Sequence, residues 1–288
     1  MTQMRAKEPI LAGVVGHPIS HSLSPLIHAF WAKRARIDGY YIPLDVPPTY
    51  DDFARAMDGL RAIGFAGVNV TLPHKEYALR YADSASAEAK AAGAANVLTF
   101  AGPGVEAHNS DIGGFAAAVR EQYSAPGQKP PAGPALILGA GGAARGVALA
   151  LKELGVAEIA VANRTREKAG ALAETFGLRV LDWAKRGEAI ETTRFLVNTT
   201  SLGMSGEPPL DVDLSGLSRE ALVADIVYAP LETLLLKTAR AQGNKTVDGL
   251  TMLMHQAVYG FNKWFGGKGV VDADLRAALE AELMRRSA

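Results

Sequence analysis

The stretch Ala135-Leu136-Ile137-Leu138-Gly139-Ala140-Gly141-Gly142-Ala143-Ala144-Arg145-Gly146 decides the fold of this chain. An apolar run leads into a glycine turn, and a helical segment rich in Ala and Leu follows it. Gly139 permits a tight turn, Gly141 lets backbone approach a pyrophosphate, and Ala144 is small where the helix packs on the strand. The unpaired backbone N–H groups at the start of that helix favour the binding of a phosphate group. The stretch therefore predicts a dinucleotide-binding turn, with an ordinary glycine-rich turn as the alternative. The expected cofactor contacts here are Gly139, Ala140, Gly141, Gly142 and Ala143.

The end of the next expected strand, Glu158 to Ala162, indicates which dinucleotide binds. An NAD site usually has Asp or Glu about 20 residues beyond the glycines, whereas this chain has Asn163-Arg164-Thr165-Arg166-Glu167-Lys168. Arg164 and Arg166 could grip a 2′-phosphate through charge-assisted hydrogen bonds. The pattern favours NADP as the cofactor. The alternative is that these charges are solvated and that Thr165 caps the next helix.

Length and charge narrow the class of protein. The 288 residues suffice for one or two domains. The chain has 30 Lys and Arg residues and 30 Asp and Glu residues. It therefore has no excess of positive charge that would favour a nucleic-acid or membrane partner. The absence of cysteine excludes disulfides and thiolate chemistry, and it fits a cytoplasmic location. The short apolar run Ile10 to Val15 predicts neither a signal peptide nor a membrane span.

A connector rich in Pro and Gly, residues 123–134, separates the glycine turn from an equally large first half. That half alternates expected strands and helices and ends in a hairpin. After the connector the alternation resumes, and the chain ends in two helices. The elements expected before the connector are strands 10–15, 40–45 and 67–71, helices 25–35, 50–63, one from 73 and 85–92, and a hairpin of 96–100 with 105–109. Those expected after it include strands 195–198 and 222–225 and helices 252–265 and 272–285. The sequence predicts two α/β units.

Three polar loops of the first half follow expected strands, where open α/β sheets bind ligands. They are residues 20–25, 69–75 and 108–115. Ser22 and Ser24 could hold a carboxylate or a diol. Because Ser24 precedes Pro25 at a helix start, we expect Ser24 as the helix cap and Ser22 as the ligand.

Lys75 and Asp111 are the candidate acid/base pair. Lys75 falls in the first turn of a helix, where the positive end of the helix dipole disfavours an ammonium. Asp111 at the end of the hairpin could lie beside it and take part in proton exchange. A plain surface lysine is the alternative.

Taken together, these motifs resemble the shikimate dehydrogenase family. The phrases that carry the resemblance run in order through nearly the whole chain. They are His21-Ser22-Leu23-Ser24-Pro25, Asn69-Val70-Thr71-Leu72-Pro73-His74-Lys75, Gly93-Ala94-Ala95-Asn96, Asn109-Ser110-Asp111, Gly139 to Ala144, Asn163-Arg164-Thr165, Asn198 to Met204, Asp225 to Pro230, and Asp248-Gly249-Leu250-Thr251-Met252-Leu253 through Gln256.

The resemblance implies an α/β fold with an N-terminal substrate domain (1–112), a Rossmann-type doubly wound NADP-binding domain (113–250) and C-terminal helices (251–288) packing back on the first domain. It implies reversible reduction of 3-dehydroshikimate to shikimate by NADPH, in chorismate and aromatic amino acid biosynthesis. Lys75 would be the general acid/base and Asp111 its partner. The implied substrate contacts are Ser22, Ser24, Thr71, Asn96, Tyr228 and Gln256. The implied cofactor contacts beyond the glycine turn are Asn163, Arg164, Thr165, Thr199, Ser201, Met204, Gly249 and Met252.

Two departures from the family pattern leave alternatives open. Ile112 follows Asp111 where a glycine is usual, and Val97 replaces a hydroxyl residue. A paralogue that acts on quinate or another ring acid is one alternative, and a non-catalytic NADP or metabolite sensor is another. We expect no metal, no nucleic acid and no membrane as partner, and a monomer or a homodimer.

Overall fold

The computed structural model describes residues 8–287, which divide into two compact units. Unit 1 comprises the residues up to Ser110 together with Ala257–Leu275. Unit 2 comprises Asp111–Gln256 and the residues from Arg276 onward. Residues 1–7, on which part of the signal-peptide expectation falls, lie outside the described residues. No helix within residues 8–287 is long and apolar enough to cross a membrane.

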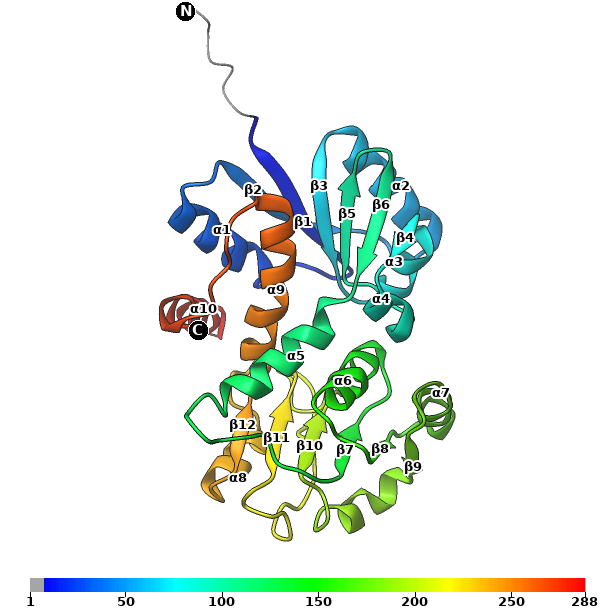
Figure 1. Ribbon diagram of the computed structural model, residues 1–288, viewed down its shortest axis with the longest axis vertical. Coiled ribbons are helices and arrows are strands. Elements are labelled where there is room, and N and C mark those ends of the chain that lie inside the picture. Colours follow the sequence, from blue (N-terminus) through cyan, green and yellow to red (C-terminus); the bar gives the residue numbers. More distant parts are fainter. Residues whose placement is uncertain (1–7, 288) are drawn as a thin grey trace, which may run out of the picture. The chain divides into compact units, whose positions relative to one another are not determined.

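Unit 1 is built on a six-stranded mixed sheet with strand order β2-β1-β3-β5-β6-β4 (Figure 1). Its strands are β1 (Ile10–Gly16), β2 (Gly39–Asp45), β3 (Phe65–Val70), β4 (Ser84–Ala85), β5 (Val97–Ala101) and β6 (Gly104–His108). Both β2 and β3 run parallel to β1, and the hairpin β5–β6 continues the sheet with β5 antiparallel to β3. Parallel neighbours end at the same edge of a sheet, so the loops after β1 and β3 are brought together.

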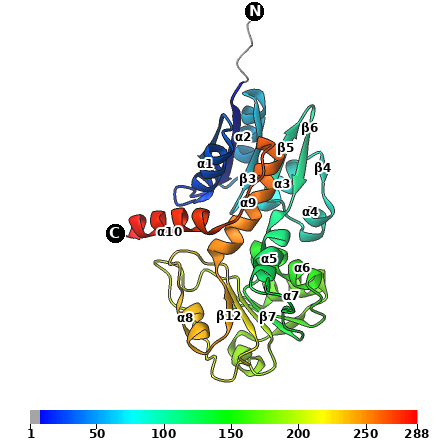
Figure 2. The same ribbon diagram turned by 60° about the vertical axis from the view of Figure 1, so that its left-hand side comes forward.

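Helices cover both faces of this sheet. They are α1 (Ser24–Ala35), α2 (Tyr50–Ala62), α3 (Lys75–Tyr81), α4 (Ala87–Ala92) and α9 (Gly249–Phe265). Helices α1 and α9 lie side by side on one face, where the rings of Trp31 and Phe261 are 5.2 Å apart (Figure 2). On the other face Phe53 of α2 packs with Tyr77 of α3, their ring centroids 6.3 Å apart.

Unit 2 is a parallel sheet of order β12-β11-β10-β7-β8-β9. Its strands are β7 (Ala135–Leu138), β8 (Ile159–Ala162), β9 (Arg179–Leu181), β10 (Phe195–Asn198), β11 (Leu222–Asp225) and β12 (Lys245–Val247). In chain order this is 6-5-4-1-2-3, the doubly wound dinucleotide-binding arrangement. The strand order reverses between β7 and β10, which marks the edge where such sheets bind ligands.

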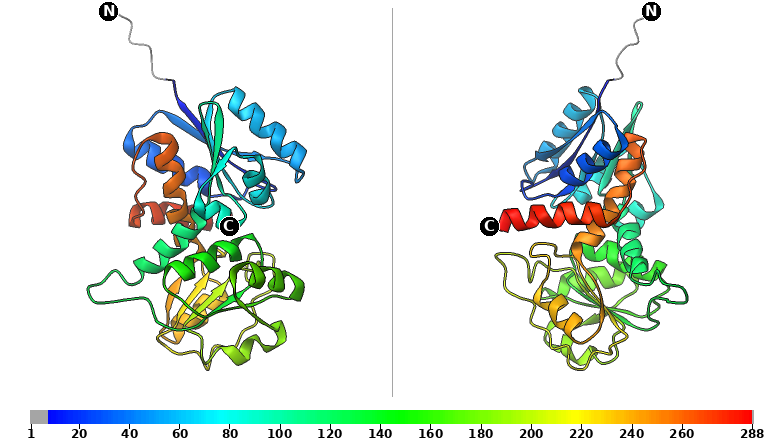
Figure 3. Two further views of the ribbon diagram at one scale, coloured as in Figure 1. Left: turned by 45° about the vertical axis from the view of Figure 1, so that its right-hand side comes forward. Right: turned by 90° about the vertical axis from the view of Figure 1, so that its left-hand side faces the viewer.

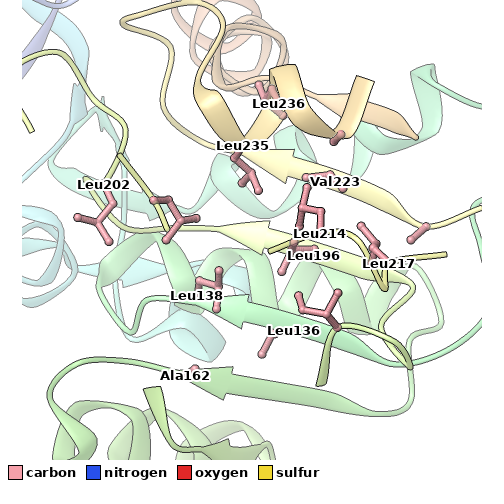
Figure 4. Packing of buried hydrophobic residues seen from close by; sticks show 14 of the residues in the cluster. Leu136, Leu138, Ala162, Leu196, Leu202, Leu214, Leu217, Val223, Leu235 and Leu236 are labelled. Carbon is pink, nitrogen blue, oxygen red and sulfur yellow. The ribbon is translucent and has the colours of Figure 1, made fainter. Parts of the chain in front are cut away.

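Aliphatic side chains fill the core of unit 2. The four central strands are buried along their whole length, as expected for strands covered on both faces. The helices are α5 (Ser110–Glu121), α6 (Gly142–Glu153), α7 (Arg166–Phe176), the 3-10 helix η1 (Trp183–Ala189), α8 (Leu234–Ala241) and α10 (Ala273–Ser287). Helices α6 and α7 lie together beside β7, β8 and β9 (Figure 3). Leu196, Val223 and Leu236 meet in the cluster between the sheet and α8 (Figure 4).

The expected elements are largely present, and the α/β fold class is confirmed. Helix α6 begins at Gly142, so its first turn is part of the glycine segment itself. The C-terminal helices divide differently from the expected range 251–288, since the residues from Arg276 onward group with unit 2. Arg276 is held there by Asp248, with Nη2 2.8 Å from Oδ2.

Candidate functional site

The candidate substrate residues of unit 1 gather at one edge of its sheet. The amide of Thr71, just after β3, donates to the carbonyl of Val15 in β1 over 2.8 Å. The amide of His17 donates to the carbonyl of Leu72 over 3.0 Å. On the other side of β3, the Val70 amide donates to the carbonyl of Asn96 over 2.8 Å. The ends of β1 and β3 and the start of β5 therefore form one polar edge.

The start of α1 differs from the expected one in which serine makes the capping contact. Leu23 occupies the N-cap position of α1 and provides no side-chain cap, and Ser24 is the first residue of the helix. The hydroxyl of Ser22 accepts the amide of Ser24 over 3.3 Å, so Ser22 supplies the capping contact. The expectation that Ser24 caps the helix was wrong, because Leu23 stands at the cap and Ser24 already lies in the first turn of α1.

Lys75 is the first residue of α3, and its backbone lies against the Asn96 loop. The amide of Ala95 donates to the carbonyl of Lys75 over 2.9 Å. Asn96 is buried, and its Oδ1 accepts the Ser110 amide over 2.7 Å. Its Nδ2 also lies 3.1 Å from the Ser110 hydroxyl. Ala95 and Asn96 together thus join the first turn of α3 to the residue that directly precedes Asp111.

Asp111 and Gln256 lie at points in unit 2 where the backbones of two helices approach each other closely. A Cβ built on Gly114 of α5 would lie 2.7 Å from the Cβ of Gln256, so only glycine allows this approach. A Cβ on Gly146 of α6 would lie 3.2 Å from the Cβ of Asp111. Because Asp111 and Gly114 are three residues apart on one helix, they share a face. This face of α5 therefore carries Asp111 beside the helix that follows the glycine turn.

Ile112 packs inside unit 2 beside Asp111. It is 5% exposed, and a Cβ on Gly146 would lie 3.9 Å from its Cγ1. Val97 is fully buried in β5. Both departures from the family pattern are thus core side chains, which indicates packing rather than ligand contact.

The glycine turn follows β7 at the point where the strand order reverses. Gly139 has φ of +107°, a conformation that L side chains rarely adopt. A Cβ there would lie 2.6 Å from Thr199 Oγ1. Thr199 follows β10, and its amide donates to the carbonyl of Leu138 over 2.7 Å. The turn and the loop after β10 are therefore in direct contact at the ligand-binding edge of the sheet.

Space is open where a pyrophosphate would approach the turn. A Cβ on Gly141 or Gly142 would meet nothing within 4 Å, so the protein's own packing requires neither glycine. Gly141 is the N-cap of α6 and makes no side-chain cap bond. The first amides of α6 thus have no side-chain acceptor at the cap, as a phosphate-binding helix start requires.

The basic segment after β8 carries uncompensated charge. Arg164 and Arg166 are exposed, and within residues 8–287 neither has a hydrogen-bond or ion-pair partner. Thr165 occupies the N-cap position of α7 and makes no side-chain cap bond. Asn163 Nδ2 donates to the carbonyl of Thr165 over 2.9 Å, which shapes the segment. Thr165 therefore stands at the N-cap as the alternative expected, although its hydroxyl makes no capping bond.

The remaining cofactor candidates lie on the loops after β10, β11 and β12. The Ser205 amide donates to the Ala229 carbonyl over 2.8 Å, which joins the loop of Ser201 and Met204 to that of Tyr228. Gly249 packs so closely that a Cβ would lie 2.2 Å from the carbonyl oxygen of Ile226. Ser201 and Met204 are exposed, Tyr228 is half-buried and Met252 is buried. These loops form a continuous rim beside the glycine turn.

Asp225 at the end of β11 organises this rim, a role that the sequence motif did not reveal. Asn198 Nδ2 donates to its Oδ1 over 2.9 Å, the Val227 amide donates to the same oxygen, and Thr233 Oγ1 donates to its Oδ2 over 2.7 Å. Burial raises the pKa of Asp225 to about 6. Only the placement of its partners on three separate segments identifies it.

No group of three or more His, Cys, Asp or Glu side chains in the described part of the chain is arranged to hold a metal ion. The fold and these two polar edges define a class: two-unit α/β proteins in which one unit carries a dinucleotide-type turn. Residues 14–98 match the family described as "Shikimate dehydrogenase substrate binding domain", and residues 131–203 match "Shikimate / quinate 5-dehydrogenase". The chain belongs to the shikimate dehydrogenase family, as its motifs predicted.

Relatives and solved structures agree with this membership. The chain is 50% identical over 274 residues to "Shikimate dehydrogenase (NADP(+))" of Acidiphilium cryptum (strain JF-5), covering 95% of this chain and 97% of that protein. It resembles the crystal structure of shikimate 5-dehydrogenase from Thermus thermophilus in complex with NADP(H) and shikimate, with a TM-score of 0.82, 37% identity, and coverage of 97% and 100%. It also resembles quinate dehydrogenase from Corynebacterium glutamicum in complex with NAD, with a TM-score of 0.87, 30% identity, and coverage of 96% and 100%.

Proposed function

We propose that this chain is an NADP-dependent dehydrogenase that interconverts shikimate and 3-dehydroshikimate. The observation that carries the proposal is the polar edge of unit 1, where the loops after β1 and β3 and the start of β5 are joined by hydrogen bonds. A small ring acid with a carboxylate and several hydroxyls matches the serines, threonine, lysine and asparagine that these loops supply. Membership of the family and identity of 50% to relatives named for this activity support it.

The substrate roles follow the chemistry of each side chain. Ser22 and Ser24 would bind the carboxylate, and Thr71 and Asn96 the ring hydroxyls. The family resemblance adds Gln256 for a hydroxyl and Tyr228 as a further contact. Asn96 is well suited to orienting a ligand because its side chain is already fixed by Ser110.

The residues of unit 2 fit NADP. The open space above Gly141 and Gly142 and the uncapped start of α6 suit the pyrophosphate. Arg164, with Asn163 and Thr165 beside it, suits a 2′-phosphate because the guanidinium is exposed and uncompensated. Thr199, Ser201, Met204, Gly249 and Met252 would border the rest of the cofactor. When bound, the nicotinamide supplies or accepts the hydride.

Lys75 would supply the proton. A ketone that receives hydride develops negative charge on its oxygen, and an ammonium both stabilises that charge and donates the proton. Asp111 would hold the lysine in its charged form. In the reverse direction the same lysine takes the proton from the hydroxyl. The intact lysine and aspartate favour an enzyme over a metabolite sensor.

Quinate is the second candidate substrate, because the quinate dehydrogenase of Corynebacterium glutamicum has nearly the same fold. Steady-state kinetics with NADP and each ring acid test the proposal. We expect kcat/KM for shikimate to exceed that for quinate. A higher kcat/KM for quinate than for shikimate would make the chain a quinate dehydrogenase. If neither acid is turned over, a non-catalytic NADP or metabolite sensor is favoured. The cytoplasmic location and a monomeric or dimeric state remain predictions.

A further inference from the structure

Arg276 of α10 forms a closed set of hydrogen bonds with Asp248 and Thr251, here called the clamp. Arg276 Nη2 donates to Asp248 Oδ2 over 2.8 Å, and its Nη1 donates to Thr251 Oγ1 over 2.9 Å. Thr251 Oγ1 in turn donates to Asp248 Oδ1 over 2.9 Å. The remaining nitrogen of Arg276, Nε, donates to Glu280 Oε1 over 2.7 Å. Because a guanidinium is a planar and rigid fork, the clamp residues hold one another in a fixed arrangement.

The clamp fixes the start of α9. Asp248 is buried and directly precedes α9, and its Oδ1 accepts the Thr251 amide over 2.8 Å as a helix cap does. Burial alone would raise the pKa of Asp248, and the bonds from Arg276 and from the Thr251 amide hold it below its usual value. Without Arg276 this carboxylate would still have Arg240, but Arg240 Nη2 lies 3.8 Å from Oδ2, beyond hydrogen-bond distance. Since a buried charge without a close partner is costly, the start of α9 would rearrange.

The first turn of α9 carries Gly249 and Met252, two of the proposed cofactor contacts. The Met252 amide donates to the carbonyl of Asp248 over 3.3 Å, so both residues follow the backbone of Asp248. The Gly249 amide donates to the carbonyl of Val227 over 3.3 Å, a long bond, and glycine has no side chain to strengthen it. The orientation of this turn against the rim therefore depends on the clamp.

We propose that Arg276 is a positioning residue for the nicotinamide end of NADP, acting through Asp248 on Gly249 and Met252. The inference rests on the proposed function, because it takes Gly249 and Met252 as neighbours of the nicotinamide. Arg276 itself does not touch the cofactor. It differs in this from Arg164, whose proposed role is direct contact with the 2′-phosphate at the other end of the same molecule.

The test compares NADPH with 2′-phospho-ADP-ribose, which is NADP without its nicotinamide. Titration calorimetry on the full chain, without a ring acid, measures the Kd of each. We expect Arg276→Met to raise the Kd of NADPH roughly 3- to 10-fold, as for the loss of one hydrogen bond, and to change the Kd of 2′-phospho-ADP-ribose by less than about twofold. Arg164→Ala should instead raise both Kd values by the same factor, because both ligands carry the 2′-phosphate.

Two further variants separate positioning from general damage to unit 2. Arg120→Met removes another ion pair of unit 2, from Arg120 Nη2 to Glu153 Oε1 over 2.8 Å, and should leave the ratio of the two Kd values unchanged. Asp248→Asn keeps an acceptor for the Thr251 amide and loses the charge that Arg276 pairs. It should change the ratio as Arg276→Met does. The double variant should change it no further, because coupled residues are not additive.

A parental ratio of the two Kd values in Arg276→Met, or an additive effect in the double variant, overturns the inference and leaves the proposed function intact. Failure of the parent protein to bind 2′-phospho-ADP-ribose overturns the NADP site and the inference with it. Thermal unfolding beside Arg120→Met shows whether Arg276→Met is folded. If it is not, Arg276→Lys keeps the charge, loses the fork and should shift the same ratio in the same direction.

Discussion

The two units present their candidate ligand contacts in opposite ways. In unit 1 the proposed contacts include buried polar side chains, Ser24 and Asn96, and Asn96 is held by a hydrogen bond from the Ser110 amide. In unit 2 they are an open glycine turn and exposed arginines without partners among the described residues. Substrate recognition is thus integrated with the packing of its unit, whereas cofactor recognition depends on backbone and on charges that the fold does not need. Substitutions in the two units should differ accordingly.

The largest expected effect is on chemistry in unit 1. Lys75→Ala should lower kcat by roughly two to four orders of magnitude, because the proton donor is lost. KM for NADP should stay nearly unchanged, since the proposed cofactor contacts lie in unit 2. Steady-state kinetics measure both constants. Lys90→Ala, an exposed lysine of the same unit, is the control, and near-parental kcat in Lys75→Ala would assign the proton to another group.

The exposed charge of unit 2 should be dispensable for folding and needed for cofactor choice. Arg164→Ala should lower kcat/KM for NADP by roughly 10- to 100-fold, the value of one hydrogen bond to a charged group. Activity with NAD and thermal stability should hardly change, because Arg164 has no partner within the described chain. Lys129→Ala is the control on the connector. An equal loss with NAD would show that Arg164 does not contact a 2′-phosphate.

Acid should destabilise unit 1 through His28. Its ring is fully buried, neither nitrogen has a partner among residues 8–287, and burial lowers its pKa from 6.5 to about 3. Below pH 6.5 the unfolded chain takes up a proton that the folded chain refuses, so stability falls by about 2 kcal/mol from pH 7 to pH 5. His28→Phe should abolish this share of the pH dependence in urea unfolding. The control His17→Gln changes an exposed histidine and should leave this pH dependence unchanged. If His28→Phe loses stability between pH 7 and pH 5 as steeply as the parent protein, His28 is not the cause.

Asp225 gives unit 2 the opposite pH dependence. Burial raises its pKa from 3.8 to about 6, so the folded chain binds the proton more tightly. The stability that this provides is present below pH 3.8 and is lost as pH rises through 6, about 1 kcal/mol between pH 5 and pH 7. Asp225→Asn should remove this dependence in urea unfolding. The exposed Asp211→Asn serves as control, and a slope unchanged by Asp225→Asn would contradict the assignment.

The smallest effect is expected at Ile112. Because its side chain is buried against α6, Ile112→Val should cost about 1 kcal/mol of stability. The ratio of kcat/KM for shikimate and quinate should stay within about twofold of the parental ratio. A larger shift in that ratio would show that Ile112 shapes the substrate pocket.

The sequence predicted the elements whose signals are local and strong. The apolar runs of β7, β8, β10 and β11 and the glycine turn needed no distant information. The strands β4, β9 and β12 were missed, because two or three residues carry no periodicity. Their pairing depends on neighbouring strands.

The grouping of the candidate site residues could be predicted from the sequence, whereas their contacts could not. Ser22, Ser24, Thr71 and Asn96 follow or precede strands, so their common edge could be inferred. The capping contact from Ser22 rather than Ser24 could not, because the sequence does not show that α1 begins at Ser24.

The most direct measurement is the rate of nicotinamide reduction by the parent protein with shikimate, using NADP and then NAD under the same conditions. We predict that shikimate reduces NADP at a rate that saturates with the concentration of each. We also predict that kcat/KM for NADP is at least about 10-fold higher than kcat/KM for NAD, because one charge-assisted contact to the 2′-phosphate has about this value. Equal efficiency with NAD, or no reduction of either cofactor by shikimate, would contradict it.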